Sequence, residues 1–369
     1  MKFLTTLLIL FSTLIFSQNS FKISGKLKGF GENSIVRIAK DNFVIDSCKI
    51  NNENFILKGK LQNSPTGVYL QIKDGETWKY SFLFIGNENI TINANKTDFP
   101  FDVKTKGSKF DNKRFDLVQK QKSLEIQRDN LLKEMFSLRE QKKWNDSLQK
   151  VFWSREEPLG KIVKIDKEYQ DLENNFVDAN INSYFALYRL DQAKAQIENK
   201  RIISNLKKLK PEFKNSFYVN SLKSHLKYPE LVVGKTYYNF SAYNANGNKI
   251  EFSNFFDGNN YVLLDFSTYY CGFCLVAIPE LEKLKPIKNL KIVTFYVDGD
   301  ENGFNKLKNK HSENWNIVWD KKGRLSETYA KYKIYGTPTM YLFKPDGTLL
   351  QKYDGLIENM SEEIEKLIK

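Results

Sequence analysis

The chain has 369 residues, too many for one ordinary hydrophobic core, so we expect two or three domains. An apolar share of 41% and an aromatic share of 14% can build such cores, which excludes a mostly disordered protein. The formal net charge is +13, but the 57 basic residues are spread along the chain among 44 acidic ones. No basic stretch alternates with aromatic residues in an RNA-binding pattern. We therefore expect a basic, solvated surface and no nucleic-acid partner.

The N-terminus has the layout of a secretory signal peptide. Lys2 is followed by an apolar run from Phe3 to Phe16, broken only by Ser and Thr, and then by small and polar residues. The run is shorter than the roughly 20 residues that a membrane-spanning helix needs. We predict a signal peptide over 1–17, cleaved after Ser17, with an uncleaved anchor as the alternative and no membrane span after cleavage. The exported chain would work in the periplasm or cell envelope, where disulfides form and persist.

Residues 18–100 are dominated by short segments of alternating polarity. Strand-like stretches separated by Gly, Asn and Pro include FKISGKL, SIVRIAK, NFILKGKL, GVYLQIKDG and ENITINA. This pattern predicts a small antiparallel β domain. Cys48 lies in another such stretch, FVIDSCKI, and is expected to be a packed strand residue rather than a catalytic one.

Residues 101–228 are predicted to be helical, because charge rises, glycine nearly disappears and a period close to 3.6 emerges. Four leucines recur every seven residues, at Leu117, Leu124, Leu131 and Leu138. The stripe beside them is mostly polar, which argues against a two-stranded coiled coil. We therefore predict an intramolecular helical hairpin whose returning helix carries Leu148 and Phe152. The region shows no catalytic constellation, and His225 is expected at its surface.

Residues 229–369 alternate between strand and helix patterns. Continuous apolar strands are predicted at 261–267 and 290–298, and another strand at 315–320, each followed by a helix. The stretch TMYLFKPDGTLLQKYDG then reads as a hairpin, and a helix closes the chain. Strands that alternate with helices before a terminal hairpin predict one α/β domain with a mixed sheet.

Two of the three cysteines lie where the first of these apolar strands ends and a helix begins, with two residues between them. A helix N-terminus offers free N–H groups and a positive partial charge, and both stabilise a thiolate. We therefore expect Cys271 to have a lowered pKa and to act as the nucleophile. Cys274, one helical turn later, could attack a mixed disulfide at Cys271 and release the substrate.

Two other roles for the cysteine pair are less consistent with the sequence. A structural disulfide between them would close a very small loop and stabilise the fold little. A zinc site would need four ligands. Cys48, His225 and His311 are the soft ligands that remain, and none lies at a ligand spacing. We expect neither a metal nor a bound cofactor.

Residues from about 231 to 369 resemble a thioredoxin-like domain, of the extracytoplasmic thiol–disulfide oxidoreductases that include the TlpA and ResA proteins. The stretch VLLDFSTYYCGFC is similar to that family's strand and active-site motif, and YGTPTMYLF to its cis-proline loop. The resemblance implies that Asp265, six residues before Cys271, is a buried acid that assists proton transfer at the second cysteine. It also implies that Pro279 kinks the active-site helix.

The same resemblance implies that Pro338 follows a cis peptide bond, which is uncommon and usually deliberate. That bond would place the backbone of Thr337 beside the cysteines, where it could pair with an extended substrate segment. Two residues depart from the family's motif, since Tyr270 replaces the usual Trp and Phe273 the usual Pro. Both are candidates for substrate contact, and Phe273 could equally pack at the helix start.

The expected architecture is thus a thioredoxin-like α/β domain over 229–369, preceded by a small all-β domain and a helical segment. The N-terminal regions resemble an arrangement in envelope proteins of Bacteroidetes-type bacteria, in which a β domain of unknown role precedes the thioredoxin-like one. The resemblance implies that the chain catalyses dithiol–disulfide exchange. Most members of the family act as reductants of protein disulfides, and the same direction is expected here. The resemblance further implies a protein disulfide or thiol as substrate and an upstream thiol–disulfide electron donor.

Two alternatives to this function stay open. Peroxiredoxin-like peroxidases use a Pro-x-x-x-Thr-x-x-Cys loop, and here Thr268 fits the threonine position while Leu264 occupies the proline position. The second alternative is a binding protein that uses the fold as a scaffold, because a fold alone does not establish an activity.

Overall fold

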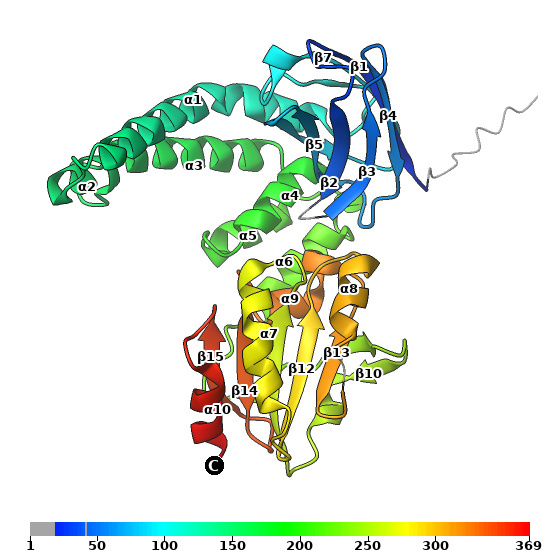
Figure 1. The fold of residues 1–369 in the computed structure, drawn as a ribbon, viewed down its shortest axis with the longest axis vertical. Coiled ribbons are helices and arrows are strands. Elements are labelled where there is room, and N and C mark those ends of the chain that lie inside the picture. The colour runs from blue at the N-terminus through cyan, green and yellow to red at the C-terminus, as the bar shows by residue number, and fades with distance from the viewer. Residues whose placement is uncertain (1–18, 41–42, 311) are drawn as a thin grey trace, which may run out of the picture.

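The computed structural model describes residues 19–40, 43–310 and 312–369. The predicted signal peptide over 1–17 and His311 lie outside the described residues. Figure 1 shows a β-rich part, an arm of helices that extends from it, and an α/β part beneath them. Within the described ranges, no helix combines the length and the apolar character needed to cross a bilayer.

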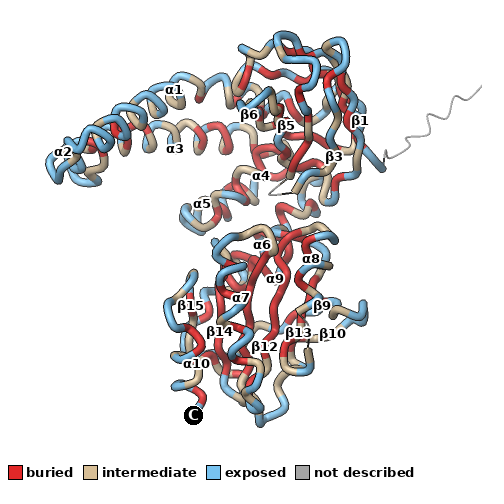
Figure 2. The backbone as a smooth tube through the Cα atoms, in the orientation of Figure 1, coloured by how far each residue is buried: buried red, intermediate tan, exposed pale blue. Residues whose placement is uncertain are grey.

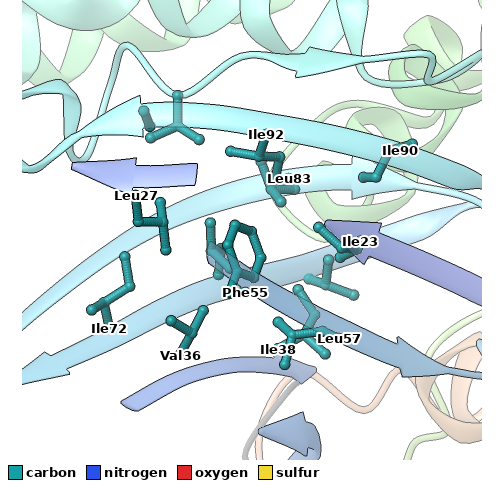
Figure 3. Packing of buried hydrophobic residues seen from close by; sticks show 14 of the residues in the cluster. Ile23, Leu27, Val36, Ile38, Phe55, Leu57, Ile72, Leu83, Ile90 and Ile92 are labelled. Atoms are coloured by element: carbon teal, nitrogen blue, oxygen red, sulfur yellow. The ribbon is translucent and has the colours of Figure 1, made fainter. Parts of the chain in front are cut away.

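The N-terminal part consists of two four-stranded sheets, with strand orders β4-β1-β7-β8 and β3-β2-β5-β6. Its strands are β1 (Phe21–Lys28), β2 (Ile35–Lys40), β3 (Phe43–Lys49), β4 (Asn54–Gly59), β5 (Thr66–Asp74), β6 (Thr77–Ile85), β7 (Asn89–Asn95) and β8 (Thr105–Lys106). Alternate residues point inward, so that Phe55 and Leu57 of β4 are buried while Ile56 is exposed. Figure 3 shows the inward side chains of both sheets meeting in one core. The prediction of an all-β region is confirmed, and its strands continue beyond residue 100.

Two details of the β part differ from the sequence-based expectation. β1 and β7 pair in parallel, so the prediction of an antiparallel domain is wrong for this pair. β6 was not predicted, because its second half is a continuous apolar run without alternation. The structure supplies the reason: Leu83 and Ile85 face the core of the sheets, whereas Phe84 packs into a second cluster formed with the helices. A strand buried on both faces loses its alternating pattern.

Helices fill the middle of the chain, as predicted. They are α1 (Asn112–Glu140), α2 (Asp146–Trp153), α3 (Lys161–Ala179), α4 (Tyr184–Ala193), α5 (Asn199–Lys207) and α6 (Phe217–Lys227). The predicted hairpin is present, since α1 and α3 lie side by side (Figure 1). However, the returning helix is α3, and Leu148 and Phe152 lie on α2 at the tip of the arm. Pro158 and Gly160 stand between α2 and α3 and end the helical pattern there.

His225 is buried, with 5% of its surface exposed, so the prediction of a surface position is wrong. The helix that carries it, α6, packs against α9 (Glu327–Lys331) of the α/β part. The buried ammonium group of Lys333 donates a hydrogen bond to the carbonyl oxygen of His225. Burial, together with the positive charges of Lys333 and Lys194, lowers the pKa of the imidazole to about 4.

The C-terminal part is built on one seven-stranded sheet with the order β10-β9-β13-β12-β11-β14-β15. The strands are β9 (Ser241–Asn244), β10 (Lys249–Glu251), β11 (Tyr261–Ser267), β12 (Leu290–Tyr296), β13 (Trp315–Trp319), β14 (Thr339–Phe343) and β15 (Leu349–Asp354). β11, β12 and β13 run parallel, whereas β14 is antiparallel to β11. The expected mixed α/β sheet of a thioredoxin-like domain is confirmed.

Both faces of this sheet are covered, and Figure 2 shows its central strands, β11 to β14, buried along most of their length. Three helices accompany it besides α9: α7 (Gly272–Leu284), α8 (Glu301–Lys308) and α10 (Met360–Ile368). Leu263 of β11 packs in the cluster that includes α7, while Val262 and Leu264 pack in the cluster on the opposite face. Because side chains alternate along a strand, Asp265 shares the α7 face with Leu263.

The carboxyl ends of β11 and β12 lie toward the N-terminal part (Figure 1). Contacts between the described residues of the two parts include a hydrogen bond, in which the side-chain amide of Asn63 donates to the carbonyl oxygen of Lys322 at 3.0 Å. Helix α6 adds a contact to the β part, because the hydroxyl of Tyr218 donates to the carbonyl oxygen of Pro65 at 2.9 Å. The rings of Phe43 and Tyr270 lie 6.3 Å apart between centroids. The edge of the sheet where the predicted site should form therefore adjoins the β part.

A buried ion pair joins the β part to the start of α1. The side chain of Arg114 is 0% exposed, and its guanidinium donates to Asp111 at 2.5 Å and to the carbonyl oxygen of Val103 at 3.0 Å. Asp111 also accepts hydrogen bonds from the amide of Phe84 and the hydroxyl of Thr105. One carboxylate thus links β6, β8 and α1.

We expect Asp111→Ala to lower the free energy of unfolding by about 3–5 kcal/mol, because it leaves the Arg114 charge buried without its partner. Urea unfolding followed by circular dichroism would measure the loss. The matched control is Lys122→Ala, which removes a partly exposed ion pair with Asp102 and should cost less than about 1 kcal/mol. Equal effects of the two substitutions would contradict the assigned role of Asp111.

Candidate active site

Cys271 is the N-cap residue of α7, with extended backbone angles of φ −98° and ψ 118°. Its Sγ accepts a hydrogen bond from the amide of Cys274 at 3.4 Å, and thereby takes the position that a Ser or Asp oxygen usually occupies. The thiol also lies 3.3 Å from the carbonyl oxygen of Thr337, to which it donates. Cys271 is half-buried and Cys274 is buried, and both are free thiols. A substrate could therefore reach the first sulfur before the second.

The surroundings of the two sulfurs separate their acidities. Burial alone would raise the pKa of Cys271, but hydrogen bonds from the thiol and amide of Cys274, the hydroxyl of Thr337 and the amide of Phe273 lower it below its ordinary value of 9.0. The pKa of Cys274 is raised to about 12, mainly by burial and further by Cys271 and the charge of Asp265. Cys271 therefore ionises first, as a nucleophile must.

Asp265 is 1% exposed and lies on the face of β11 that α7 covers. One carboxylate oxygen accepts a hydrogen bond from the hydroxyl of Thr294 at 2.9 Å, and that hydroxyl accepts another from the indole of Trp315 at 2.9 Å. The other oxygen, Oδ1, accepts no hydrogen bond from any described residue. Burial raises the pKa of Asp265 from 3.8 to about 7, against the opposing effect of the Thr294 hydrogen bond. A carboxyl group with this pKa can both take up and release a proton near neutral pH.

The Thr337–Pro338 peptide bond is cis, as the sequence predicts. The loop is held in place by β14, which pairs with β11 so that Thr339 lies opposite Phe266. The residue that follows β15 also holds the loop, because the amide of Gly355 donates to the carbonyl oxygen of Pro338 at 2.9 Å. The structure thus brings Thr337 and Pro338 to the cysteines. Pro279 lies inside α7, as expected.

The remaining two predicted residues flank Cys271. The hydroxyl of Tyr270 donates to Asp300 at 2.8 Å, and its amide donates to the hydroxyl of Thr268 at 3.2 Å. Phe273 is 66% exposed, so most of its ring is open to solvent rather than packed at the helix start. Exposed Val276 and Tyr335 add to the apolar surface of α7 and the cis-proline loop.

Sequence reasoning missed a pair of acids that follows β12. Asp298 is buried and accepts a hydrogen bond from the hydroxyl of Thr268. Asp300 accepts from the hydroxyl groups of Tyr270 at 2.8 Å and Tyr296 at 2.5 Å, and so fixes the residue before Cys271. The sequence signal was available, because Asp-Gly-Asp follows a predicted buried strand, and sites in α/β sheets form at the carboxyl ends of strands.

Comparison with protein families gives a match to each end of the chain. Residues 233–352 match the AhpC/TSA family, and residues 21–114 match a domain of unknown function, DUF4369. The first match contains both cysteines, Asp265 and the cis-proline loop. No curated protein matches the chain.

Solved structures from Bacteroides are similar to the C-terminal part. The thioredoxin domain of a thiol-disulfide oxidoreductase from Bacteroides vulgatus is 23% identical, with 38% of this chain and 100% of that chain covered and a TM-score of 0.34. A thiol-disulfide oxidoreductase from Bacteroides fragilis is 28% identical, with 36% and 99% covered and a TM-score of 0.32. A thiol:disulfide interchange protein from Bacteroides sp. is 25% identical, with 37% and 90% covered and a TM-score of 0.33.

We expect Asp265→Asn to stabilise the protein at alkaline pH. An acid whose pKa is higher in the folded state than in the unfolded state costs the folded state free energy once it ionises. The penalty is absent below about pH 4, grows as the pH rises to about 7 and is complete above that. A rise from 3.8 to about 7 corresponds to at most about 4 kcal/mol. Urea unfolding should therefore show the variant to be more stable by about 2–4 kcal/mol at pH 8 and unchanged at pH 4.

The matched control is Asp346→Asn. The hydroxyl and amide of Thr348 lower the pKa of this turn residue, so its replacement should give no stabilisation at pH 8. A gain of equal size at both pH values for Asp265→Asn would show that packing, rather than ionisation, causes it.

Proposed function

We propose that this chain is a thiol–disulfide oxidoreductase that reduces protein disulfides by dithiol–disulfide exchange at Cys271 and Cys274. One observation carries the proposal. The helix start lowers the pKa of the accessible sulfur, while burial raises that of its neighbour to about 12. A nucleophile and a protected second thiol are the two groups that such an exchange requires.

In the first step, the thiolate of Cys271 attacks one sulfur of the substrate disulfide. A bond forms between Cys271 Sγ and that sulfur, the substrate S–S bond breaks, and the other substrate sulfur leaves as a thiolate that takes a proton from water. Low pKa favours the attacking anion at neutral pH. The amide of Cys274, which donates to Cys271 Sγ at 3.4 Å, holds this sulfur at the start of α7.

In the second step, Cys274 loses its proton and attacks Cys271 Sγ. The mixed disulfide breaks, the Cys271–Cys274 disulfide forms, and the second substrate sulfur leaves with its electron pair. Asp265, buried beneath α7 with a pKa of about 7, is the proposed acceptor of the Cys274 proton. Two electrons have then passed from the cysteine pair to the substrate. A dithiol electron donor outside this chain must supply them again.

Substrate binding is proposed at the surface around Cys271. The backbone of Thr337 and Pro338 can pair with an extended substrate segment, because β-type main-chain hydrogen bonds recognise such segments without reading their sequence. Tyr270 and the exposed ring of Phe273 would contact side chains beside the substrate cysteine. We further propose export to the periplasm or cell envelope and an organisation into domains over 18–100, 101–228 and 229–369.

The peroxidase alternative has less support from the geometry. The hydroxyl of Thr268 donates to the Asp298 carboxylate and accepts from the amide of Tyr270, so it is engaged away from Cys271. Leu264, at the position of the peroxiredoxin proline, is a core residue of β11. We therefore expect hydrogen peroxide turnover to be negligible beside disulfide reduction in the same preparation.

Cys271→Ser should reduce the rate of insulin reduction with a dithiol donor to the uncatalysed background, because no nucleophile remains. Cys274→Ser should instead accumulate a mixed disulfide with the substrate, since nothing resolves it. Non-reducing gel electrophoresis and mass spectrometry would detect that adduct. Cys48→Ser is the control and should keep wild-type activity. An active Cys271→Ser variant would refute the proposal.

A further inference from the structure

A groove that includes Tyr270, the residue before Cys271, is lined by residues of both the β part and the α/β part. It has a volume of about 560 Å³, within the range of ligand-binding clefts. Its lining residues come from the start of β3, the residue before the nucleophile and α8: Phe43, Val44, Tyr270, Asn302, Asn305 and Lys306. The β part, which contributes no group to the chemistry proposed above, therefore supplies one wall of a groove whose other lining residues include Tyr270, the residue before the nucleophile.

The two aromatic rings of this groove are held from different sides. The hydroxyl of Tyr270 donates to Asp300, which is itself fixed by the amide of Gly303 at 2.7 Å. Phe43 begins β3 and pairs with Lys40 of β2. The two rings lie 6.3 Å apart and are inclined by 31°, a spacing typical of a favourable aromatic pair.

The position of Phe43 is also fixed by what lies behind it. A smaller cavity of about 130 Å³ separates the β part from the loop after β12, and Phe43 lines both this cavity and the groove. Nearby, Asn63 donates to the carbonyl oxygen of Lys322 at 3.0 Å and connects the two parts. The side chain of Phe43 thus lies between the interface cavity on one side and the groove on the other.

The walls of the groove differ in chemistry. One wall is apolar, with the rings of Phe43 and Tyr270 and the side chain of Val44, which is 45% exposed. The α8 wall is polar, with two amide side chains and the ammonium group of Lys306, which lies 4.6 Å from the centroid of the Tyr269 ring. A peptide segment with an apolar side chain and an acidic side chain fits both walls.

We infer that this groove binds the residues that flank the attacked cysteine of a client protein, and that Phe43 is a specificity-determining residue. The inference rests on the proposed function, because it names the substrate class of the same site. An aromatic or apolar client residue would pack against the rings of Phe43 and Tyr270, and an acidic one would face Lys306. The β part then selects clients for the cysteines of the α/β part.

The test uses three disulfides and the full mature chain. One is a peptide with an internal disulfide and a Phe and a Glu beside the attacked cysteine. The second peptide has Ser at both positions. The third is 2-hydroxyethyl disulfide, which has no flanking residues. For the wild type we expect kcat/KM to be about fivefold higher for the Phe–Glu peptide than for the Ser peptide, mainly through KM.

Phe43→Ala should bring the two peptides to within about twofold of each other, while its reaction with 2-hydroxyethyl disulfide stays at the wild-type rate. Phe43→Leu keeps an apolar side chain in place and should show an intermediate preference, which separates loss of the ring from disruption of the β part. Ile56→Ala is the matched control. This residue is apolar, 50% exposed and belongs to the same β part, but it lines a different surface, so the preference should not change.

Three results would overturn the inference. The first is an unchanged preference in Phe43→Ala, and the second is an equal loss of rate on all three disulfides, which would place the effect on the thiols or the fold. The third is a wild-type protein without any peptide preference. Failure of the proposed function is distinguishable, because the wild type would then reduce none of the three disulfides, and the inference would fall with it.

Discussion

The site depends on one constraint, the abrupt change from a buried strand to a helix at Cys271. β11 is buried on both faces of the sheet, and α7 must return immediately to cover one of them. The first amides of α7 then need hydrogen-bond acceptors. The sulfur of Cys271 accepts a hydrogen bond from one of these amides, that of Cys274. Local backbone geometry therefore favours the thiolate form of Cys271. The same turn of helix carries Cys274, whose side chain is buried.

The buried acid under the helix opposes stability and supports chemistry. Asp265 has a hydrogen bond from Thr294 but no cationic partner within the part of the chain that the structure describes. An acid in this environment is costly to ionise, which is why its pKa approaches neutrality. Strongly shifted titratable groups in such positions are characteristic of sites that transfer protons. The same raised pKa of Asp265 therefore destabilises the fold and provides the proton acceptor proposed for Cys274.

Local patterns predicted the cysteine pair, and the family resemblance of short motifs added Asp265 and the Thr337–Pro338 loop, but neither predicted the surroundings of the site. The apolar run of β11, the Cys-x-x-Cys spacing and the proline of the Thr337–Pro338 loop are each encoded within a few residues. The burial of His225, the parallel pairing of β1 with β7 and the two-sided burial of β6 all depend on elements that are distant in sequence. The pairing of Phe43 with Tyr270 is of the same kind. No periodicity in either segment could indicate it, because it arises from how two parts that are distant in sequence are placed in the fold.

The account requires the helix start to lower the pKa of one particular sulfur, that of Cys271, and this can be measured directly. The pH dependence of the thiolate absorbance of the reduced protein, compared with that of Cys271→Ser, isolates the ionisation of this one thiol. The account predicts a midpoint clearly below 9.0, the ordinary value for a cysteine, with the second sulfur ionising only in strongly alkaline solution. A Cys271 midpoint at or above 9.0 would contradict it.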